Sequence, residues 1–346
     1  QELNEPLQFV LDSVCTPLRV VDGREWTDQE QGVAELAAQE RAQGIALDQP
    51  SLQRVLLVRT GEHQHQLIWT YHHILVDGWS HRHLIGEVLG LYAGPDLVPP
   101  TPYRDYIAWL QRQDAGAGER FWREQLASLE EPCLLASTVP VQAGRQGHEA
   151  LYSHLDAEPL SAFARSQHVT LNTLVQGAWL ILLSRFSGQR SVAFGSTVAG
   201  RSPTLPGAER IMGLFINTLP VVRELHPEAH VGAWLRELQD CNLGMRDHEY
   251  VALADIQRWA GQAGRALFDS IIVFENQPVD EALRQFSDAS LEFGPSTGSG
   301  LTDFPMDLMV TVEHGCLSIE YMYLRRCFVD ETVLAIRAAM ESLLQR

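Results

Sequence analysis

Strand and helix signals occur on both sides of one aperiodic stretch, and this arrangement constrains the fold more than any other feature of the sequence. The stretch covers residues 132–147, contains Pro140, Gly144 and Gly147, and has no apolar periodicity. Strand and helix patterns precede it at residues 54–60, 65–72, 81–92, 103–113 and 118–129, and follow it at residues 150–155, 159–167, 172–186, 191–196 and 215–222. We therefore predict an α+β fold with an N-terminal lobe at residues 1–135, a linker at 136–147 and a C-terminal lobe at 148–346.

The charge balance excludes several classes of function. The chain has 26 basic and 44 acidic residues, a formal net charge of −18, which repels nucleic acids and anionic membranes. All of the basic residues are arginine, so chemistry that requires a lysine, such as Schiff-base catalysis, is excluded. No apolar run reaches the length of a membrane span. We expect neither a nucleic-acid partner nor a membrane partner.

The cysteines and the first residues suggest a cellular location. The five cysteines are widely scattered and form no CxxC pair, which is typical of buried thiols in a reducing compartment. The first residues, QELNEP, have neither a basic start nor an apolar stretch and so do not form a signal peptide. We expect a cytoplasmic protein.

The sharpest motif lies between the strand at 65–72 and the helix at 81–92. Residues 71–80 read YHHILVDGWS, with Ser80 as the expected N-cap of the helix. Successive strand residues point to opposite faces, so only one of His72 and His73 can face a given cleft. A neutral imidazole is a natural acceptor for the proton of an attacking amine or alcohol. Asp77 suits a structural role beside an arginine, and Gly78 allows a ligand to approach the backbone.

A metal site is the competing interpretation of this region. Six histidines fall within 21 residues, and an HxH pair on a strand can direct two rings to one side; they are His63, His65, His72, His73, His81 and His83. No carboxylate or thiol completes a ligand set at metal-binding spacing, and His63 and His65 lie at the turn remote from the motif. We therefore predict no metal. The absence of a GxSxG motif also favours direct transfer between two substrates over an acyl-enzyme.

From the histidine motif onward, the chain resembles the condensation domains of nonribosomal peptide synthetases, which belong to the chloramphenicol-acetyltransferase-like superfamily. Besides the HHxxxDG motif at residues 72–78, the resemblance rests on five stretches in order: YRDYIAW at 103–109, TLNTLVQGAW at 170–179, Gly200-Arg201, MGLFINTLP at 212–220, and LFD with VFEN at 267–269 and 273–276. It implies two acetyltransferase-like lobes in a V-shaped pseudo-dimer with a tunnel between them.

The resemblance also implies an activity. Condensation domains are acyltransferases that form an amide between two thioester substrates, each tethered to the 4'-phosphopantetheine arm of a carrier domain, and they bind no cofactor of their own. It implies that His73 accepts or orients the proton of the acceptor amine, His72 supports it, Asp77 holds the loop and Gly78 leaves room for an arm. Trp79, Asn217 and Ser196 are assigned to the substrate tunnel, although a strand-end hydrogen bond is an equally good interpretation of Asn217. The expected partners are upstream and downstream carrier domains and an adenylation domain.

One part of the family pattern is not found. An RHExLRT-like segment, which supplies an arginine partner for the aspartate of the motif, has no match, so the first segment of the N-terminal lobe is expected to be missing. Both histidines are kept, unlike in cyclising members, and the glutamate motif of epimerising members is not found. An inactive carrier-docking domain and a stand-alone acyltransferase that forms an ester remain as alternatives to condensation.

Overall fold

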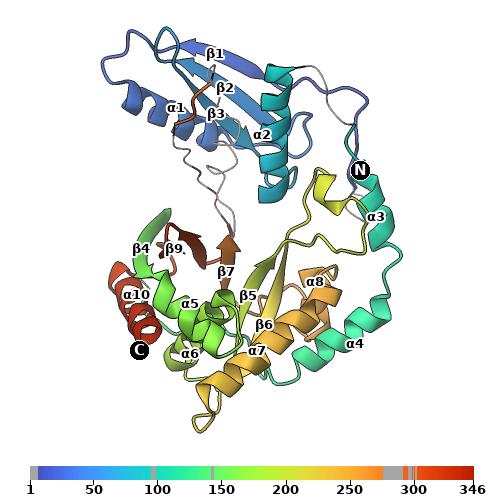
Figure 1. Ribbon diagram of the computed structural model, residues 1–346, viewed down its shortest axis with the longest axis vertical. Coiled ribbons are helices and arrows are strands. Elements are labelled where there is room, and N and C mark those ends of the chain that lie inside the picture. The colour runs from blue at the N-terminus through green and yellow to red at the C-terminus, as the bar shows by residue number, and fades with distance from the viewer. Residues whose placement is uncertain are drawn as a thin grey trace. The chain divides into compact units, whose positions relative to one another are not determined.

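The computed structural model describes residues 7–94, 99–141, 144–275, 291–294, 298, 300 and 302–346. The chain divides into two compact units, Gln1–His81 and Arg82–Arg346. Each unit combines one β-sheet with helices, which confirms the predicted α+β class (Figure 1). The helix α2 (Gly78–Ala93) begins in the first unit and continues into the second.

The first unit contains a three-stranded sheet with the order β1-β2-β3. Its strands are β1 (Leu18–Asp22), β2 (Gln53–Arg59) and β3 (His65–Tyr71), and the helix α1 (Gln29–Gln43) connects the first two. β1 and β2 are parallel, as a helical crossover requires, whereas β2 and β3 form the predicted antiparallel hairpin.

Ion pairs attach α1 to this sheet. Glu40 of α1 lies 2.9 Å from Nε of Arg54 on β2 and 3.4 Å from Nη2 of Arg19 on β1. Arg19 is the register partner of Leu56, which is buried together with Val58. The face of the sheet that carries Arg19 and Arg54 therefore holds α1 by two guanidinium groups.

The second unit contains a six-stranded mixed sheet with the order β4-β9-β8-β7-β5-β6. Its strands are β4 (His148–Asp156), β5 (Ser191–Val198), β6 (Asn217–Glu224), β7 (Ser270–Glu275), β8 (Met306–Glu313) and β9 (Cys316–Leu324). Its helices are α3 (Arg104–Leu110), α4 (Ala115–Gln125), α5 (Ala157–Ser166), α6 (Leu171–Ser187), α7 (Val231–Met245), α8 (Leu253–Trp259) and α10 (Asp330–Gln345). In Figure 1, α5, α6 and α7 lie across one face of this sheet.

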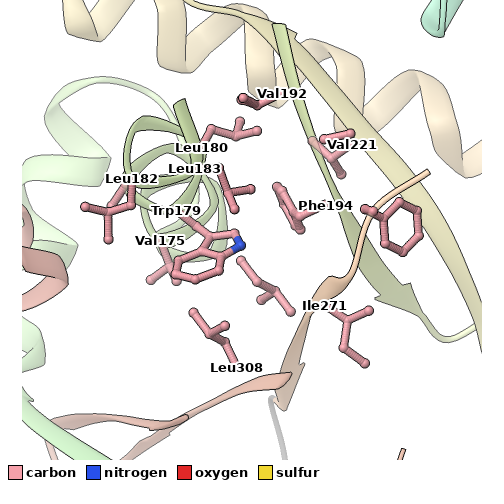
Figure 2. Close-up of a cluster of buried hydrophobic side chains, with 14 of the residues drawn as sticks. Val175, Trp179, Leu180, Leu182, Leu183, Val192, Phe194, Val221, Ile271 and Leu308 are labelled. Carbon is pink, nitrogen blue, oxygen red and sulfur yellow. The ribbon is translucent and has the colours of Figure 1, made fainter. Parts of the chain in front are cut away.

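The core of the second unit is built around α6. This helix is apolar on most of its surface, which is typical of a buried helix, and it begins at the Thr170 cap and ends at Gly188. Figure 2 shows its side chains directed at residues of β5, β7 and β8, among them Phe194, Ile271 and Leu308. Within the described part of the chain, no helix combines the length and the apolar character that a membrane span needs.

Asp269 attaches the segment after α4 to the start of β7. Its buried carboxylate accepts hydrogen bonds from the amides of Leu135 and Ala136, each at 2.8 Å. Burial raises the pKa of this carboxyl group, and the two amides act in the opposite direction. The lobe boundaries at residues 135 and 148 stay a prediction. Asn276, the last residue of the VFEN stretch, lies outside the described residues.

Three of the sequence motifs meet in a second, aromatic cluster. The rings of Tyr106 and Phe215 lie 4.1 Å apart, and the hydroxyl of Tyr103 donates to the carbonyl of Leu214 at 2.5 Å. The guanidinium of Arg201 lies 4.0 Å from the centre of the Phe215 ring and donates to the carbonyls of nearby residues. The YRDYIAW, Gly200-Arg201 and MGLFINTLP motifs therefore pack together in this unit.

Phe215 of this cluster leaves no room for a side chain at Gly200, so replacing Gly200 tests the packing. Its φ is +64°, and a Cβ atom would lie 1.9 Å from the carbonyl oxygen of Phe215. Gly188 is a matched control: its φ is +72°, but within the ranges that the structure describes only its own chain neighbours come within 4 Å of a Cβ atom built there. Gly188→Ala should cost about 1–2 kcal/mol of the free energy of unfolding for its backbone conformation alone, and Gly200→Ala should cost substantially more. Chemical denaturation measures both losses, and equal losses would contradict the packing described.

Candidate functional site

The HHxxxDG motif forms a turn between β3 and α2, and hydrogen bonds close this turn at both ends. The amide of His72 donates to the carbonyl of Leu52 at 2.9 Å, which extends the pairing of the hairpin by one residue. The amide of Leu75 donates to the carbonyl of His72 at 3.0 Å, and the amide of His81 donates to the carbonyl of Asp77 at 2.8 Å. The backbone therefore passes from strand to helix within a few residues.

Asp77 caps the helix that follows the turn. Its side chain is 1% exposed, and Oδ1 accepts a hydrogen bond from the amide of Ser80 at 2.7 Å. The prediction of Ser80 as the N-cap is therefore wrong: α2 begins at Gly78, three residues before the predicted start, and Ser80 occupies its third position. A carboxylate there satisfies a free amide and interacts favourably with the positive end of the helix dipole.

His72 is held by its own turn. Its Nδ1 accepts a hydrogen bond from the amide of Ile74 at 3.1 Å. A ring nitrogen that accepts a hydrogen bond carries no proton, so neutral His72 has its proton on Nε2. The half-buried ring and this bond fix both its orientation and its tautomer.

His73 lies in a different environment from His72. Its side chain is exposed, and its ring centre lies 6.5 Å from that of Tyr71. Tyr71 in turn lies 4.8 Å from Trp69, whose indole stacks on His81 of α2 at 4.7 Å. Burial, with a smaller contribution from the charge of Asp77, raises the pKa of Tyr71. His72 and His73 thus differ in exposure although both lie in the turn after β3 ends at Tyr71, and the ring of Tyr71 lies beside the exposed His73.

Gly78 and Trp79 form the exposed start of α2. Apart from its chain neighbours and the backbone of its own helix, no atom of the described residues lies within 4 Å of a Cβ atom built on Gly78, so the local fold does not require a glycine there. Trp79 is 37% exposed. Both residues lie in the first unit together with His72, His73 and Asp77.

Ser196 and Asn217 lie in the second unit, where both take part in structural hydrogen bonds. Buried Ser196 on β5 accepts a hydrogen bond from Gln176 of α6 at 3.3 Å, and Gln176 accepts one from Asn242 of α7 at 2.7 Å. No sequence pattern predicts this hydrogen-bond network, because it joins two helices and a strand that lie far apart in the sequence.

Asn217, at the start of β6, uses all of its side-chain groups within the fold. Its Nδ2 donates to the carbonyls of Glu249 and Val251 at 2.9 and 2.7 Å, and its Oδ1 accepts from the amide of Thr218 at 2.9 Å. Since an asparagine amide has two hydrogens, both donors are engaged. This geometry favours the strand-end interpretation of Asn217, in which it holds the segment before α8.

The six histidines of the first subsection are distributed along the hairpin and α2. His65 begins β3, and His72 follows its end, so the strand separates them by roughly 20 Å. Among the described residues, no group of three or more histidine, cysteine, aspartate or glutamate side chains is arranged to hold a metal ion.

Comparison with known proteins identifies close relatives of this chain. The family model "Condensation domain" matches residues 1–346. A component of the linear gramicidin synthase of Brevibacillus parabrevis is 40% identical over 303 residues, which is 81% of this chain and 4% of the relative. Chondramide synthase cmdD of Chondromyces crocatus is 42% identical over 284 residues, which is 79% of this chain and 7% of the relative. The chain thus spans only a small part of these relatives.

A solved structure resembles the fold over nearly the whole chain. The X-domain from teicoplanin biosynthesis has a TM-score of 0.80 at 19% identity, with 98% of this chain and 80% of that chain covered. At 19% identity, this similarity shows a shared fold alone.

The cap at Asp77 leads to a prediction about stability. Asp77→Ala removes the acceptor of the Ser80 amide and should lower the free energy of unfolding by about 1–2 kcal/mol from the cap alone. Asp77→Asn keeps an acceptor at the same place and should retain most of the stability. Thermal and urea unfolding of the three proteins measure the difference. Unchanged stability in Asp77→Ala would contradict the capping role.

Proposed function

Because this chain belongs to the condensation-domain family, we propose that it forms a peptide bond between two tethered substrates. The donor is an acyl or peptidyl thioester and the acceptor is the amine of an aminoacyl thioester, each carried on the 4'-phosphopantetheine arm of a carrier domain. The observation that carries this proposal is the exposed imidazole of His73 on a turn whose other polar members, Asp77 and His72, are engaged with the backbone.

The reaction needs one proton acceptor and one proton donor. The acceptor amine attacks the thioester carbonyl, the C–N bond forms and the C–S bond breaks. His73 takes the proton that the amine nitrogen loses, and that proton then passes to the departing thiolate of the donor arm. An exposed imidazole suits both transfers, since a neutral ring accepts a proton and the charged ring returns it.

The remaining motif residues hold or admit the groups that react. Asp77 fixes the start of α2, and His72 fixes the turn through the amide of Ile74, so that His73 projects from an ordered backbone. The absence of a side chain at Gly78 allows a phosphopantetheine arm to approach the backbone. Trp79 offers an exposed aromatic surface next to Gly78 in the chain.

The partners follow from the length of the relatives. Because the chain matches only 4% and 7% of the two synthases, we propose that carrier and adenylation domains adjoin it in a longer polypeptide. A domain that only docked carriers would bind them without forming a product, and an ester-forming acyltransferase would accept a soluble alcohol. Assays with loaded carriers separate these alternatives from condensation.

Replacement of His73 tests the proposed base. His73→Ala should slow amide formation between loaded carrier proteins by about 10²–10⁴-fold, the usual contribution of general-base catalysis. His65→Ala is the matched control, because His65 is exposed at the opposite end of β3. Mass spectrometry of the carrier-bound product measures the rate, and circular dichroism checks the fold of both variants. Near wild-type turnover in His73→Ala would contradict the base.

Chelation tests whether a metal takes part. His63 and His65 lie at the far end of β3 from His73. We therefore expect the protein to condense its substrates at an unchanged rate after treatment with EDTA. The measurement is the same product assay before and after chelation, with metal analysis of the protein. Stoichiometric zinc with activity that is lost on chelation and restored by zinc would overturn the role of His73 as a free base.

A further inference from the structure

Three rings pack against one another where β3 meets α2. Trp69 and Tyr71 lie two residues apart on β3, so their side chains share one face of the strand, and their ring centres are 4.8 Å apart. His81 of α2 stacks on both rings, at 4.7 Å from Trp69 and 5.5 Å from Tyr71. We call these three residues the ring cluster. They lie in the first unit, together with His73.

A hydrogen bond from the neighbouring strand fixes Trp69 within the ring cluster. Its Nε1 donates to Oε1 of Gln53 at 3.0 Å, and Nε2 of Gln53 donates to Oγ1 of Thr16 at 3.0 Å. Gln53 begins β2 and lies opposite Tyr71 in the sheet. The indole is therefore held by β2 as well as by its contacts with the other two rings.

His81 fixes the ring cluster from the side of the helix. Its amide donates to the carbonyl of Asp77 at 2.8 Å, so its backbone belongs to the first turn of α2. The ring of Tyr71 contacts both His81 and Trp69. Tyr71 is thus half-buried and in contact with two partners whose own positions are fixed.

The ring of Tyr71 also lies beside the imidazole of His73. The two ring centres are 6.5 Å apart and their planes are inclined by 53°, which is within the range of tilted aromatic pairs. The side chain of His73 is exposed, and an exposed side chain exchanges rotamers rapidly unless a neighbour restricts it. A fixed ring beside the imidazole excludes the rotamers that would overlap with that ring.

We propose that Tyr71 is a positioning residue for His73, an inference that rests on the proposed condensation reaction. The ring of Tyr71 restricts the imidazole to orientations in which it can take the proton of the attacking amine, and Trp69 and His81 hold that ring in place. The contribution is geometric, because a general base acts only within hydrogen-bond reach of the proton that it removes.

The aromatic ring of Tyr71, and not its hydroxyl group, performs this role. Burial raises the pKa of Tyr71, so the hydroxyl keeps its proton at neutral pH and does not compete with His73 as a base. The contacts with Trp69, His81 and His73 are contacts between rings. A phenylalanine at this position should therefore position His73 as the tyrosine does.

Variants of Tyr71 test the proposal in single-turnover amide formation between loaded carrier proteins. Tyr71→Phe keeps the ring and should retain the wild-type rate. Tyr71→Leu and Tyr71→Met remove the ring and should each slow the reaction about tenfold, as expected for a slightly misplaced base. The carrier concentration that gives half of the maximal rate should not change, because Tyr71 acts on His73 and not on binding. Tyr92→Leu is the matched control, since Tyr92 is 69% exposed near the opposite end of α2.

Nuclear magnetic resonance measures the surroundings of the imidazole without any reaction. His73→Ala assigns the ring-proton signals of His73 in the histidine spectrum. Tyr71→Leu should shift these signals because the ring current of Tyr71 is lost, whereas Tyr71→Phe and Tyr92→Leu should leave them close to their wild-type positions. Unmoved His73 signals in Tyr71→Leu would overturn the proposal.

The same substitution in the His73→Ala background separates this inference from the proposed function. There Tyr71→Leu should change the remaining rate little, because no imidazole is left to position. Equal fold-losses in both backgrounds, or equal losses in Tyr71→Phe and Tyr71→Leu, would overturn the role of Tyr71 and leave His73 as the base. A wild-type rate in His73→Ala would contradict the proposed base and, with it, the role of Tyr71.

Discussion

The hydrogen bond from the amide of Ser80 to the carboxylate of Asp77 determines where β3 ends and α2 begins. Because Asp77 caps the helix at Gly78, only residues 72–77 remain to connect the two elements, and the chain closes a tight turn. His72 is then used to hold this turn, and His73 is left exposed. The stacking of Trp69 on His81 fixes the first turn of the helix to the strand that carries the histidines.

The second unit uses its sequence motifs for packing. Tyr106, Arg201 and Phe215 come from three motifs that are far apart in the chain, and they meet in one aromatic cluster. Gly200 makes this approach possible, since a side chain there would collide with the backbone of Phe215. Asn217 and Ser196 likewise serve hydrogen bonds of the fold. A family motif can therefore mark a structural requirement as well as a reacting group.

Local patterns predicted the parts of the structure that local interactions decide. The hairpin and the buried helix α6 follow from apolar periodicity. The unequal exposure of His72 and His73 comes instead from the turn that follows β3, since this strand ends at Tyr71. The start of α2 was misjudged because Asp77 and Ser80 are both good caps, and only the turn geometry decides between them. The hydrogen bonds of Ser196 and Asn217 join elements that lie far apart in the sequence, and apolar periodicity does not predict such contacts.

The central claim is that Asp77 serves the reaction by holding the turn that presents His73. A double-mutant cycle measures this coupling directly, with single-turnover amide formation between loaded carrier proteins as the readout. Asp77→Ala should slow the reaction in the wild-type background, because the imidazole of His73 is then no longer held in place. In the His73→Ala background the same substitution should change the rate little, because no imidazole remains to be placed. An equal fold-loss in both backgrounds would contradict the account, since Asp77 would then act on the reaction independently of His73.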